Sequence, residues 1–159
     1  MTKRKIRPKK HIFKIDDVPQ EFDFHLIGVQ TKVELYRLVY DFNRIFLTDF
    51  FLTDDISVVR KNIQVSFENY VTSPNVLGQK MRFINNEILI PFSHPQSLFD
   101  THEAYYLFPE LTSLNYLLML PGTQLTTAII KQNFKTSYQN QWIDVDMKKC
   151  HTAFPVFPA

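Results

Sequence analysis

Glycine is rare in this sequence, which has 159 residues and three glycines, Gly28, Gly78 and Gly122. Phosphate-binding loops of the Walker and dinucleotide types need several glycines within a few residues, because their backbone must approach the phosphates closely. Neighbouring glycines here are more than forty residues apart. The sequence therefore excludes a glycine-rich nucleotide site.

Cysteine is rarer still, since Cys150 is the only one. A single cysteine excludes an internal disulfide and every zinc or iron–sulfur site with several cysteine ligands. Paired acids such as Asp54-Asp55 lack the alternating oxygen ligands and the turn glycine of a calcium loop. The five histidines have no second histidine or acid at a recognised metal-ligand spacing: His11, His25, His94, His102 and His151. We therefore expect no metal ion and no cofactor.

Long hydrophobic runs are also missing. The longest stretch without a charged residue, 111–130, includes nine residues, among them Asn115, Pro121 and Gln124, that a bilayer would penalise. The basic first ten residues are not followed by the apolar segment of a secretory signal. A lone cysteine is typical of a reducing compartment. Together these features predict a cytoplasmic protein without a membrane span.

Positive charge is concentrated at the start of the chain. Residues 1–10 carry six basic side chains and no acid: Lys3, Arg4, Lys5, Arg7, Lys9 and Lys10. The other 149 residues carry 12 basic against 16 acidic side chains, a net charge of about −4. Two interpretations stay open, a phosphate-binding arm for RNA or DNA and a solvated start that helps solubility. We expect a disordered basic arm over residues 1–10.

The rest of the chain is rich enough in large apolar residues to form one domain. Hydrophobic residues make up 45% of the sequence, and 15 residues are phenylalanine. This composition and length favour a single folded domain over residues 11–146, followed by an irregular C-terminal tail over 147–159.

Hydrophobic periodicity predicts two helices. Thr31 and Glu34 have the spacing of a capping box at a helix N-terminus. Behind them, apolar residues recur at three- and four-residue steps, as on the buried face of a helix: Leu35, Leu38, Val39, Phe42, Ile45 and Phe46. A second helix, which Thr123 would cap, carries Leu125, Ile129, Ile130 and Phe134.

Apolar segments predict the strands of an antiparallel sheet. An alternating strand with one buried face is expected over 22–29, further strands over 63–67, 104–108 and 142–145, and a central strand over 114–120. Segments 80–84 and 87–92 flank Asn85-Asn86, which suits a two-residue hairpin, and residues 93–103 resemble a loop. This order predicts an α+β fold, a ferredoxin-like (split βαβ) sheet with two helices and an extra hairpin. The alternative is an open α+β two-layer sheet.

One stretch resembles a known signature. Phe108-Pro109-Glu110, three residues and then Leu114-Asn115-Tyr116 resemble the motif that names the IPExxxVDY family, with Phe for Ile, Leu for Val and Asn for Asp. Residues 22–29 and 142–149 are similar to the opening and the C-terminal strand of that family, so the resemblance covers about residues 20–150. It implies a small bacterial cytoplasmic protein without an established activity. If the family's acid were catalytic, Asn115 would make this member inactive, and a role in packing the strand fits better.

The sequence contains no matched set of acid, base and nucleophile, so we expect a protein that is not an enzyme. The leading hypothesis is a protein-interaction or regulatory module that docks on itself or on another cytoplasmic protein. Its candidate contact residues are Phe50 and Phe51, and Phe154 and Phe157, although each pair could instead complete the core. One alternative is an RNA-binding accessory protein that uses the basic arm. Another is a small-molecule-sensing domain, by analogy with ferredoxin-like folds.

Overall fold

The computed structural model describes residues 24–92, 98–99, 101–122 and 125–151. Over these residues the chain has an α+β fold with two α-helices and ten strands, all paired antiparallel. The six basic residues at the start, the expected helix cap Thr123, and Phe154 and Phe157 lie outside the described residues.

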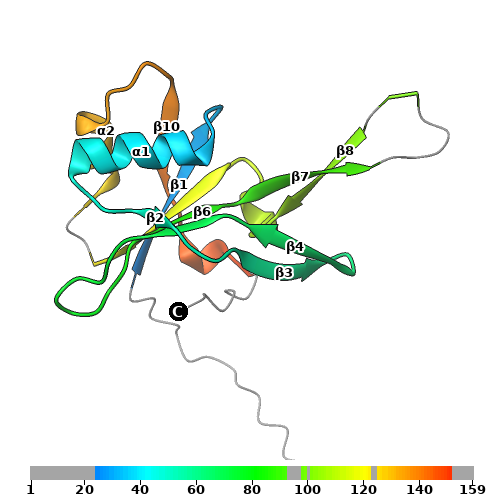
Figure 1. Cartoon of the computed structure of the whole chain (residues 1–159), viewed down its shortest axis with the longest axis horizontal. Coiled ribbons are helices and arrows are strands. Elements are labelled where there is room, and N and C mark those ends of the chain that lie inside the picture. The colour runs from blue at the N-terminus through cyan, green and yellow to red at the C-terminus, as the bar shows by residue number, and fades with distance from the viewer. Residues whose placement is uncertain (1–23, 93–97, 100, 123–124, 152–159) are drawn as a thin grey trace, which may run out of the picture.

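A six-stranded antiparallel sheet forms the centre of the fold (Figure 1), with the strand order β10-β1-β9-β6-β5-β2. Its strands are β1 (Phe24–Thr31), β2 (Phe51–Leu52), β5 (Asn69–Val71), β6 (Arg82–Asn85), β9 (Tyr116–Pro121) and β10 (Asn140–Asp144). Strand β9 lies between β1 and β6, which confirms the central position expected from its continuous apolar run. The outer edges of the sheet belong to β10 and β2.

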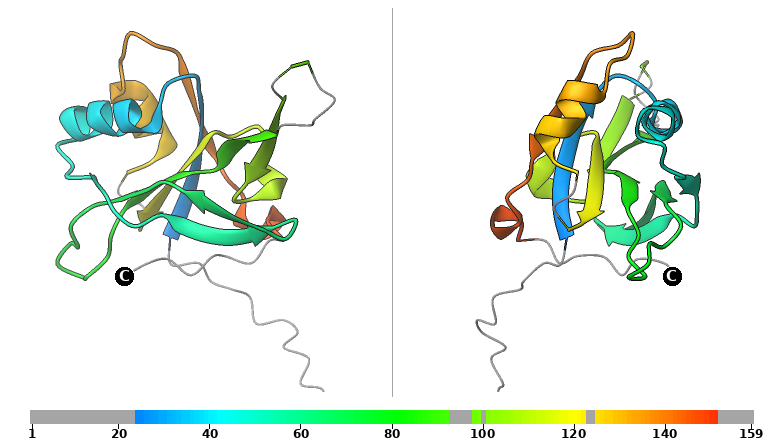
Figure 2. Two further views of the ribbon diagram at one scale, coloured as in Figure 1. Left: turned by 45° about the vertical axis from the view of Figure 1, so that its right-hand side comes forward. Right: turned by 90° about the vertical axis from the view of Figure 1, so that its left-hand side faces the viewer.

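Helices cover one face of this sheet and two hairpins cover the other (Figure 2). The covering elements are α1 (Leu35–Phe46), α2 (Thr127–Asn133), the hairpin β3–β4 (Ile56–Arg60 and Ile63–Phe67) and the hairpin β7–β8 (Glu87–Phe92 and Thr101–Tyr106). On the helix side a buried core includes Phe42, Phe83 and Trp142. On the hairpin side a second core includes Phe67 and Leu117. We call these the helix core and the hairpin core.

Strand β1 is buried on both faces, so the expectation of one buried face is wrong. Leu26 and Ile27 are adjacent in sequence and both fully buried, because Leu26 faces the hairpin core and Ile27 faces the helix core. The strand also passes close to Leu114 at Gly28. A methyl group built on Gly28 would lie 2.2 Å from Cδ1 of Leu114, so only glycine fits there without a shift of the neighbour.

Helix α1 confirms the helix expected from the apolar stripe, with Leu35, Leu38 and Phe42 buried against the sheet. The expected capping box is wrong. Glu34 is the N-cap and makes no side-chain cap hydrogen bond. Thr31 still belongs to β1, and its hydroxyl donates across to the backbone carbonyl of Gln139 while it accepts from the N–H of Val33.

The hairpin expected over 80–84 and 87–92 is wrong. Strand β6 pairs with β5 and β9 in the central sheet, whereas β7 pairs with β8 in a separate two-stranded sheet. Asn86, which was expected in an exposed turn, is fully buried between them. The chain therefore crosses from one layer to the next at Asn86, and the hairpin partner of β7 is the later segment that begins at Thr101.

Helix α2 and strand β10 lie close to their expected positions. The N-cap of α2 is Thr126, three residues after the expected cap Thr123. Its side chain accepts a hydrogen bond from the N–H of Ile129. Strands β2 and β5 were not expected, since segments of two and three residues are too short to show a periodic pattern. Strand β3 was also missed. After β10, Met147 opens a short 3-10 turn and packs against the hairpin core.

We predict that Gly28→Ala destabilises the protein by about 1–3 kcal/mol, because its methyl group overlaps the buried Leu114 side chain. Urea unfolding followed by circular dichroism measures the loss. Leu114→Ala makes room for the new methyl group, so the double variant should lose clearly less stability than the sum of the two single effects. A strictly additive result would contradict the close contact.

Candidate functional site

The fully buried Asn86 joins the two layers at the position of the family-like motif. Its Nδ2 donates to the backbone carbonyls of Leu111 and Leu114, both at 2.9 Å. Its Oδ1 accepts from the N–H of Phe108 at 2.9 Å. One buried side chain thus bonds three backbone groups, of which the Leu111 carbonyl also accepts from the N–H of Leu114.

Asn115 of the motif directly precedes β9 and extends the pairing of β9 with β1. Its N–H donates to the carbonyl of Val29 in β1. Its Oδ1 accepts from the N–H of Thr31 at 2.9 Å, where a backbone carbonyl would accept if the two strands continued to pair. Its Nδ2 donates to Oε2 of Glu87 at 3.2 Å. Asparagine can accept and donate at once, which an ionised aspartate at this position cannot do.

The other motif residues lie at the same junction between the two layers. Phe108 and Leu114 are buried in the hairpin core, and Pro109 starts the 3-10 turn Pro109–Leu111. The hydroxyl of Tyr116 donates to the carbonyl of Val33 at 2.6 Å. Burial, together with nearby carboxylates, raises the pKa of Tyr116 to about 12, so its hydroxyl stays protonated at neutral pH. Glu110 accepts from the N–H of His151 at 2.9 Å.

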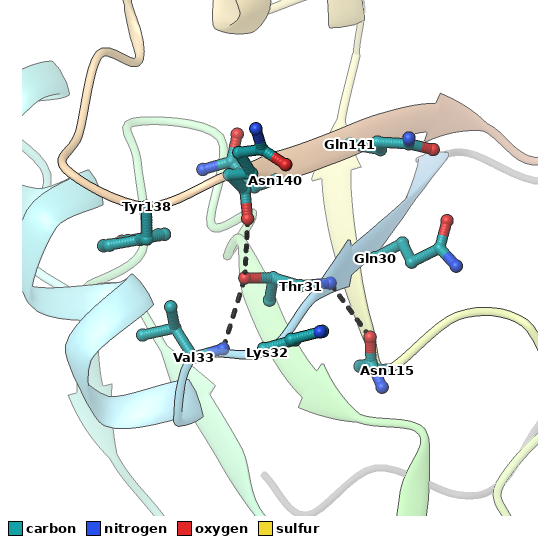
Figure 3. A pocket seen from close by; sticks show the side chains of 9 residues that line it. Gln30, Thr31, Lys32, Val33, Asn115, Tyr138, Asn140 and Gln141 are labelled. Atoms are coloured by element: carbon teal, nitrogen blue, oxygen red, sulfur yellow. Dashed lines mark hydrogen bonds between the residues drawn. The ribbon is translucent and has the colours of Figure 1, made fainter.

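An open cleft of about 530 Å³ lies where β1 ends and β10 begins (Figure 3), and we call it the amide cleft. Five of its nine lining residues carry side-chain amides, and Lys32 is the only charged one. The lining consists of Gln30, Thr31, Lys32, Val33, Asn115, Tyr138, Gln139, Asn140 and Gln141. Side-chain amides donate and accept hydrogen bonds, so this surface suits a polar group such as a peptide.

Tyr138 is held firmly on one side of the amide cleft. Its hydroxyl donates to Oδ2 of Asp41 at 2.9 Å, and the Arg37 guanidinium lies 5.5 Å from the centre of its ring. Burial, and next the hydrogen bond to Asp41, raise the pKa of Tyr138 well above its ordinary value. The phenol is therefore a neutral donor to α1 rather than an acid or a base for catalysis.

A second cleft of about 260 Å³ lies between α2 and β10, and we call it the strand–helix cleft. Its lining consists of Lys131, Phe134, Asn140, Gln141, Trp142 and Ile143, so it shares Asn140 and Gln141 with the amide cleft. Oδ1 of Asn140 accepts from Nε1 of Trp142 at 3.1 Å. Nδ2 of Asn140 is buried and has no hydrogen-bond partner among the described residues. A buried donor without a partner is costly, and an acceptor on a bound molecule would remove that cost.

Asp144 accepts two side-chain hydrogen bonds at the far end of β10. Oγ1 of Thr127 donates to its Oδ1, and Nε2 of His25 contacts the same oxygen at 2.9 Å. The bond from Thr127, with that from His25, holds the pKa of Asp144 below its usual range. In a catalytic triad the hydroxyl of the nucleophile is hydrogen-bonded to the imidazole. Here the hydroxyl and the imidazole are both bonded to the carboxylate instead. The arrangement ties α2 and β1 to β10.

The remaining candidates for chemistry are the thiol of Cys150 and groups of metal-ligating side chains. Burial raises the pKa of the Cys150 thiol, and Glu110 and Asp146 raise it further, which disfavours the nucleophilic thiolate. Among the residues that the structure describes, no group of three or more histidine, cysteine, aspartate or glutamate side chains could hold a metal ion.

The apolar residues proposed as contact residues separate into two environments. Phe50 is 6% exposed and packs against the rings of Phe42 and Phe83, so its assignment to the surface is wrong. Phe51, the first residue of β2, is 50% exposed. Successive side chains of an extended chain point to opposite faces, which explains why one completes the helix core and the next meets solvent.

The outer part of the β7–β8 hairpin, which we call the apolar arm, carries four exposed apolar side chains: Leu89, Phe92, Leu98 and Phe99. The hairpin projects from the body of the molecule (Figure 1) and pairs with no strand of the central sheet. Its base is fixed by Tyr105, which is buried in the hairpin core, and by an ion pair between Lys61 and Glu103. This arm differs from the expectation, because the pattern of 80–84 and 87–92 predicts a hairpin between these two segments.

Comparison with known proteins identifies no relative: no family model, no curated protein and no solved structure matches the chain. None of the helices in the described part of the chain is long and apolar enough to cross a membrane.

We predict that Asn115→Asp lowers the free energy of unfolding by about 1–3 kcal/mol at neutral pH, because it replaces the donor on Glu87 with a second carboxylate. Repulsion raises a carboxyl pKa in the folded state, so the loss should be small near pH 4 and grow as the pH rises. Urea unfolding at several pH values measures this dependence. Adding Glu87→Gln should recover most of the loss, and a loss that depends on neither pH nor Glu87 would contradict the pairing.

We also predict that Asp144 contributes to acid sensitivity. Its pKa is lowered in the folded state, so its stabilising effect is present above the unfolded pKa of about 4 and is lost as the pH falls through the folded value. Thermal unfolding between neutral and acidic pH should therefore show a steeper loss for the wild type than for Asp144→Asn. Asp54→Asn, which changes an exposed carboxylate in another part of the fold, is the control. Parallel curves for the wild type and Asp144→Asn would contradict this role.

Proposed function

We propose that this protein is a non-enzymatic protein-interaction module that docks on itself or on another cytoplasmic protein through the apolar arm. The observation that carries this proposal is the set of exposed apolar side chains on a hairpin that projects beyond both cores. Leu98 is 96% exposed, and Phe99 is 80% exposed. Apolar side chains grouped on a projecting element are typical of protein contact surfaces, whose centres are depleted in charge.

The chemistry of the described side chains supports a role without catalysis. The two tyrosines with the largest pKa shifts, Tyr116 and Tyr138, are protonated donors to backbone and to Asp41. The imidazole of His25 and the hydroxyl of Thr127 both bond to the carboxylate of Asp144. In these contacts the groups hold parts of the fold together, which supports a structural role for them.

Membership of the IPExxxVDY family and a ferredoxin-like fold are part of the same proposal. The motif residues support the first, since they form one coherent junction around Asn86 and Asn115. The strand order β10-β1-β9-β6 supports the second, with α1 following β1 and α2 joining β9 to β10. Strands β5 and β2 would then extend one edge of that arrangement.

RNA binding is the second candidate function, and the outer face of α1 favours it. Tyr36 and Tyr40 are exposed there, one turn apart, and Arg44 is exposed a further turn along. Exposed aromatic rings can stack on bases, and arginine can contact phosphate. The basic residues 1–10, which lie outside the described residues, are part of the same candidate function through their charge.

We predict that Leu98→Asp abolishes docking, because a charge at the end of the arm must be desolvated in any apolar contact. Sedimentation at several concentrations measures self-association, and a lysate pull-down, with and without nuclease, measures retained partners. Val59→Asp is the matched control, since Val59 is 66% exposed on the other hairpin.

The Val59→Asp variant should behave like the wild type in both measurements, with unchanged circular dichroism for both variants. If Leu98→Asp keeps the wild-type assembly state and the wild-type pull-down profile, the arm is not the docking surface. Retained material that disappears after nuclease treatment would instead favour the RNA-binding candidate.

A further inference from the structure

We propose that the outer edge of β10 binds an extended, acidic segment of a partner protein as an added strand. This site lies on the central sheet, apart from the apolar arm, and does not depend on docking by the arm. In strand addition the backbone groups of an exposed edge supply affinity, while pockets beside the edge select side chains.

The hydrogen-bond pattern shows which backbone groups of β10 are available. The N–H of Val145 donates to the carbonyl of Leu26 in β1. Backbone groups alternate in direction along an antiparallel strand, so those of residues 141 and 143 also face β1. The N–H and carbonyl groups of Asn140, Trp142 and Asp144 therefore point away from the sheet. No other strand of the described part of the chain pairs with this edge.

The length of β10 distinguishes it from the opposite edge. Natural sheets protect their edges by short strands, bulges, proline or charged side chains that point inward. Strand β2, at the other edge, follows this rule with two residues. Strand β10 has five residues without a proline, and its one charged side chain, Asp144, is bonded to Thr127 and His25. It is therefore long enough for several main-chain hydrogen bonds.

Two clefts lie beside the exposed edge and share Asn140 and Gln141. The strand–helix cleft separates the edge from α2, and the amide cleft continues past the start of β10. Nδ2 of Asn140 lies at their common boundary as a buried donor without a partner among the described residues. An extended chain along this edge would bring acceptors to that donor and place side chains in the clefts.

The charges of the clefts favour an acidic segment. Lys32 is the only charged residue that lines the amide cleft, and Lys131 is the only one that lines the strand–helix cleft. The nearest acid on β10, Asp144, lines neither cleft and is bonded to Thr127 and His25, and Lys131 is close enough to add to the lowering of its pKa. Carboxylates on the bound segment would therefore meet lysines without a carboxylate in the lining to oppose them.

The test begins with selection of a phage-displayed library of random peptides on the full-length protein. Enriched peptides are expected to be acidic, and their affinities are measured by fluorescence anisotropy. Lys131→Glu should weaken binding by about tenfold, because an attractive contact becomes repulsive. Lys135→Glu, an equal change next to α2 that lines neither cleft, should leave the affinity unchanged.

A second pair of variants tests the donor and the charge of the clefts together. Asn140→Asp keeps an acceptor for Nε1 of Trp142 but replaces the donor with a carboxylate that repels an acidic segment, so binding should weaken by about tenfold or more. Asn62→Asp, in the exposed β3–β4 turn at φ 63°, is the control and should bind like the wild type. The arm variant Leu98→Asp should also bind the peptide normally, which separates this proposal from docking by the arm.

Amide hydrogen exchange followed by NMR gives the decisive readout. Peptide binding should slow exchange at Asn140, Trp142 and Asp144, while residues 141 and 143 are protected with or without peptide. Failure to enrich any peptide, equal affinities for Lys131→Glu and Lys135→Glu, or unchanged exchange at Trp142 would overturn the proposal. A dimer that pairs two copies of β10 and excludes the peptide would overturn it too, with a second copy of this chain as the occupant.

Discussion

The buried side-chain amide of Asn86 is the interaction on which the two-layered arrangement depends. This fully buried side chain bonds two carbonyls and one N–H of the segment 108–114. An unpaired buried backbone group costs about 1–3 kcal/mol, so a residue without both a donor and an acceptor would leave this junction strained. Because Asn86 points inward, β7 leaves the central sheet and can pair with β8 in the second layer.

This layering determines where the protein can bind other molecules. Both faces of the central sheet are covered, by helices on one side and by hairpins on the other. Surfaces that stay exposed include the outer edge of β10 with its two clefts, the outer face of α1 and the end of the β7–β8 hairpin. An unpaired strand edge and a group of exposed apolar side chains are both features through which proteins contact other chains.

Regular apolar patterns predicted the helices and strands in which the apolar residues of the pattern are the ones that the fold buries. Helix α1 followed from a stripe that one core buries, and β9 followed from a continuous apolar run that two cores bury. The pattern failed at β1, where residues 22–29 resembled a strand with one solvent face. The hairpins that cover the second face come from distant parts of the chain, so no local window contains the reason for burial.

Composition and periodicity by themselves determined the α+β class, the helix at 35–46, the central strand and the lack of glycine-rich and multi-cysteine sites, because these depend on residue counts and local spacing. Only the tertiary structure decided that Asn86 is a buried junction rather than a turn, that Phe50 is core while Phe51 is surface, and that β10 lies at an edge beside two clefts. Each of these depends on contacts between residues far apart in sequence. A long-range hydrogen bond to a buried backbone group outweighs the local preference of Asn85-Asn86 for a turn.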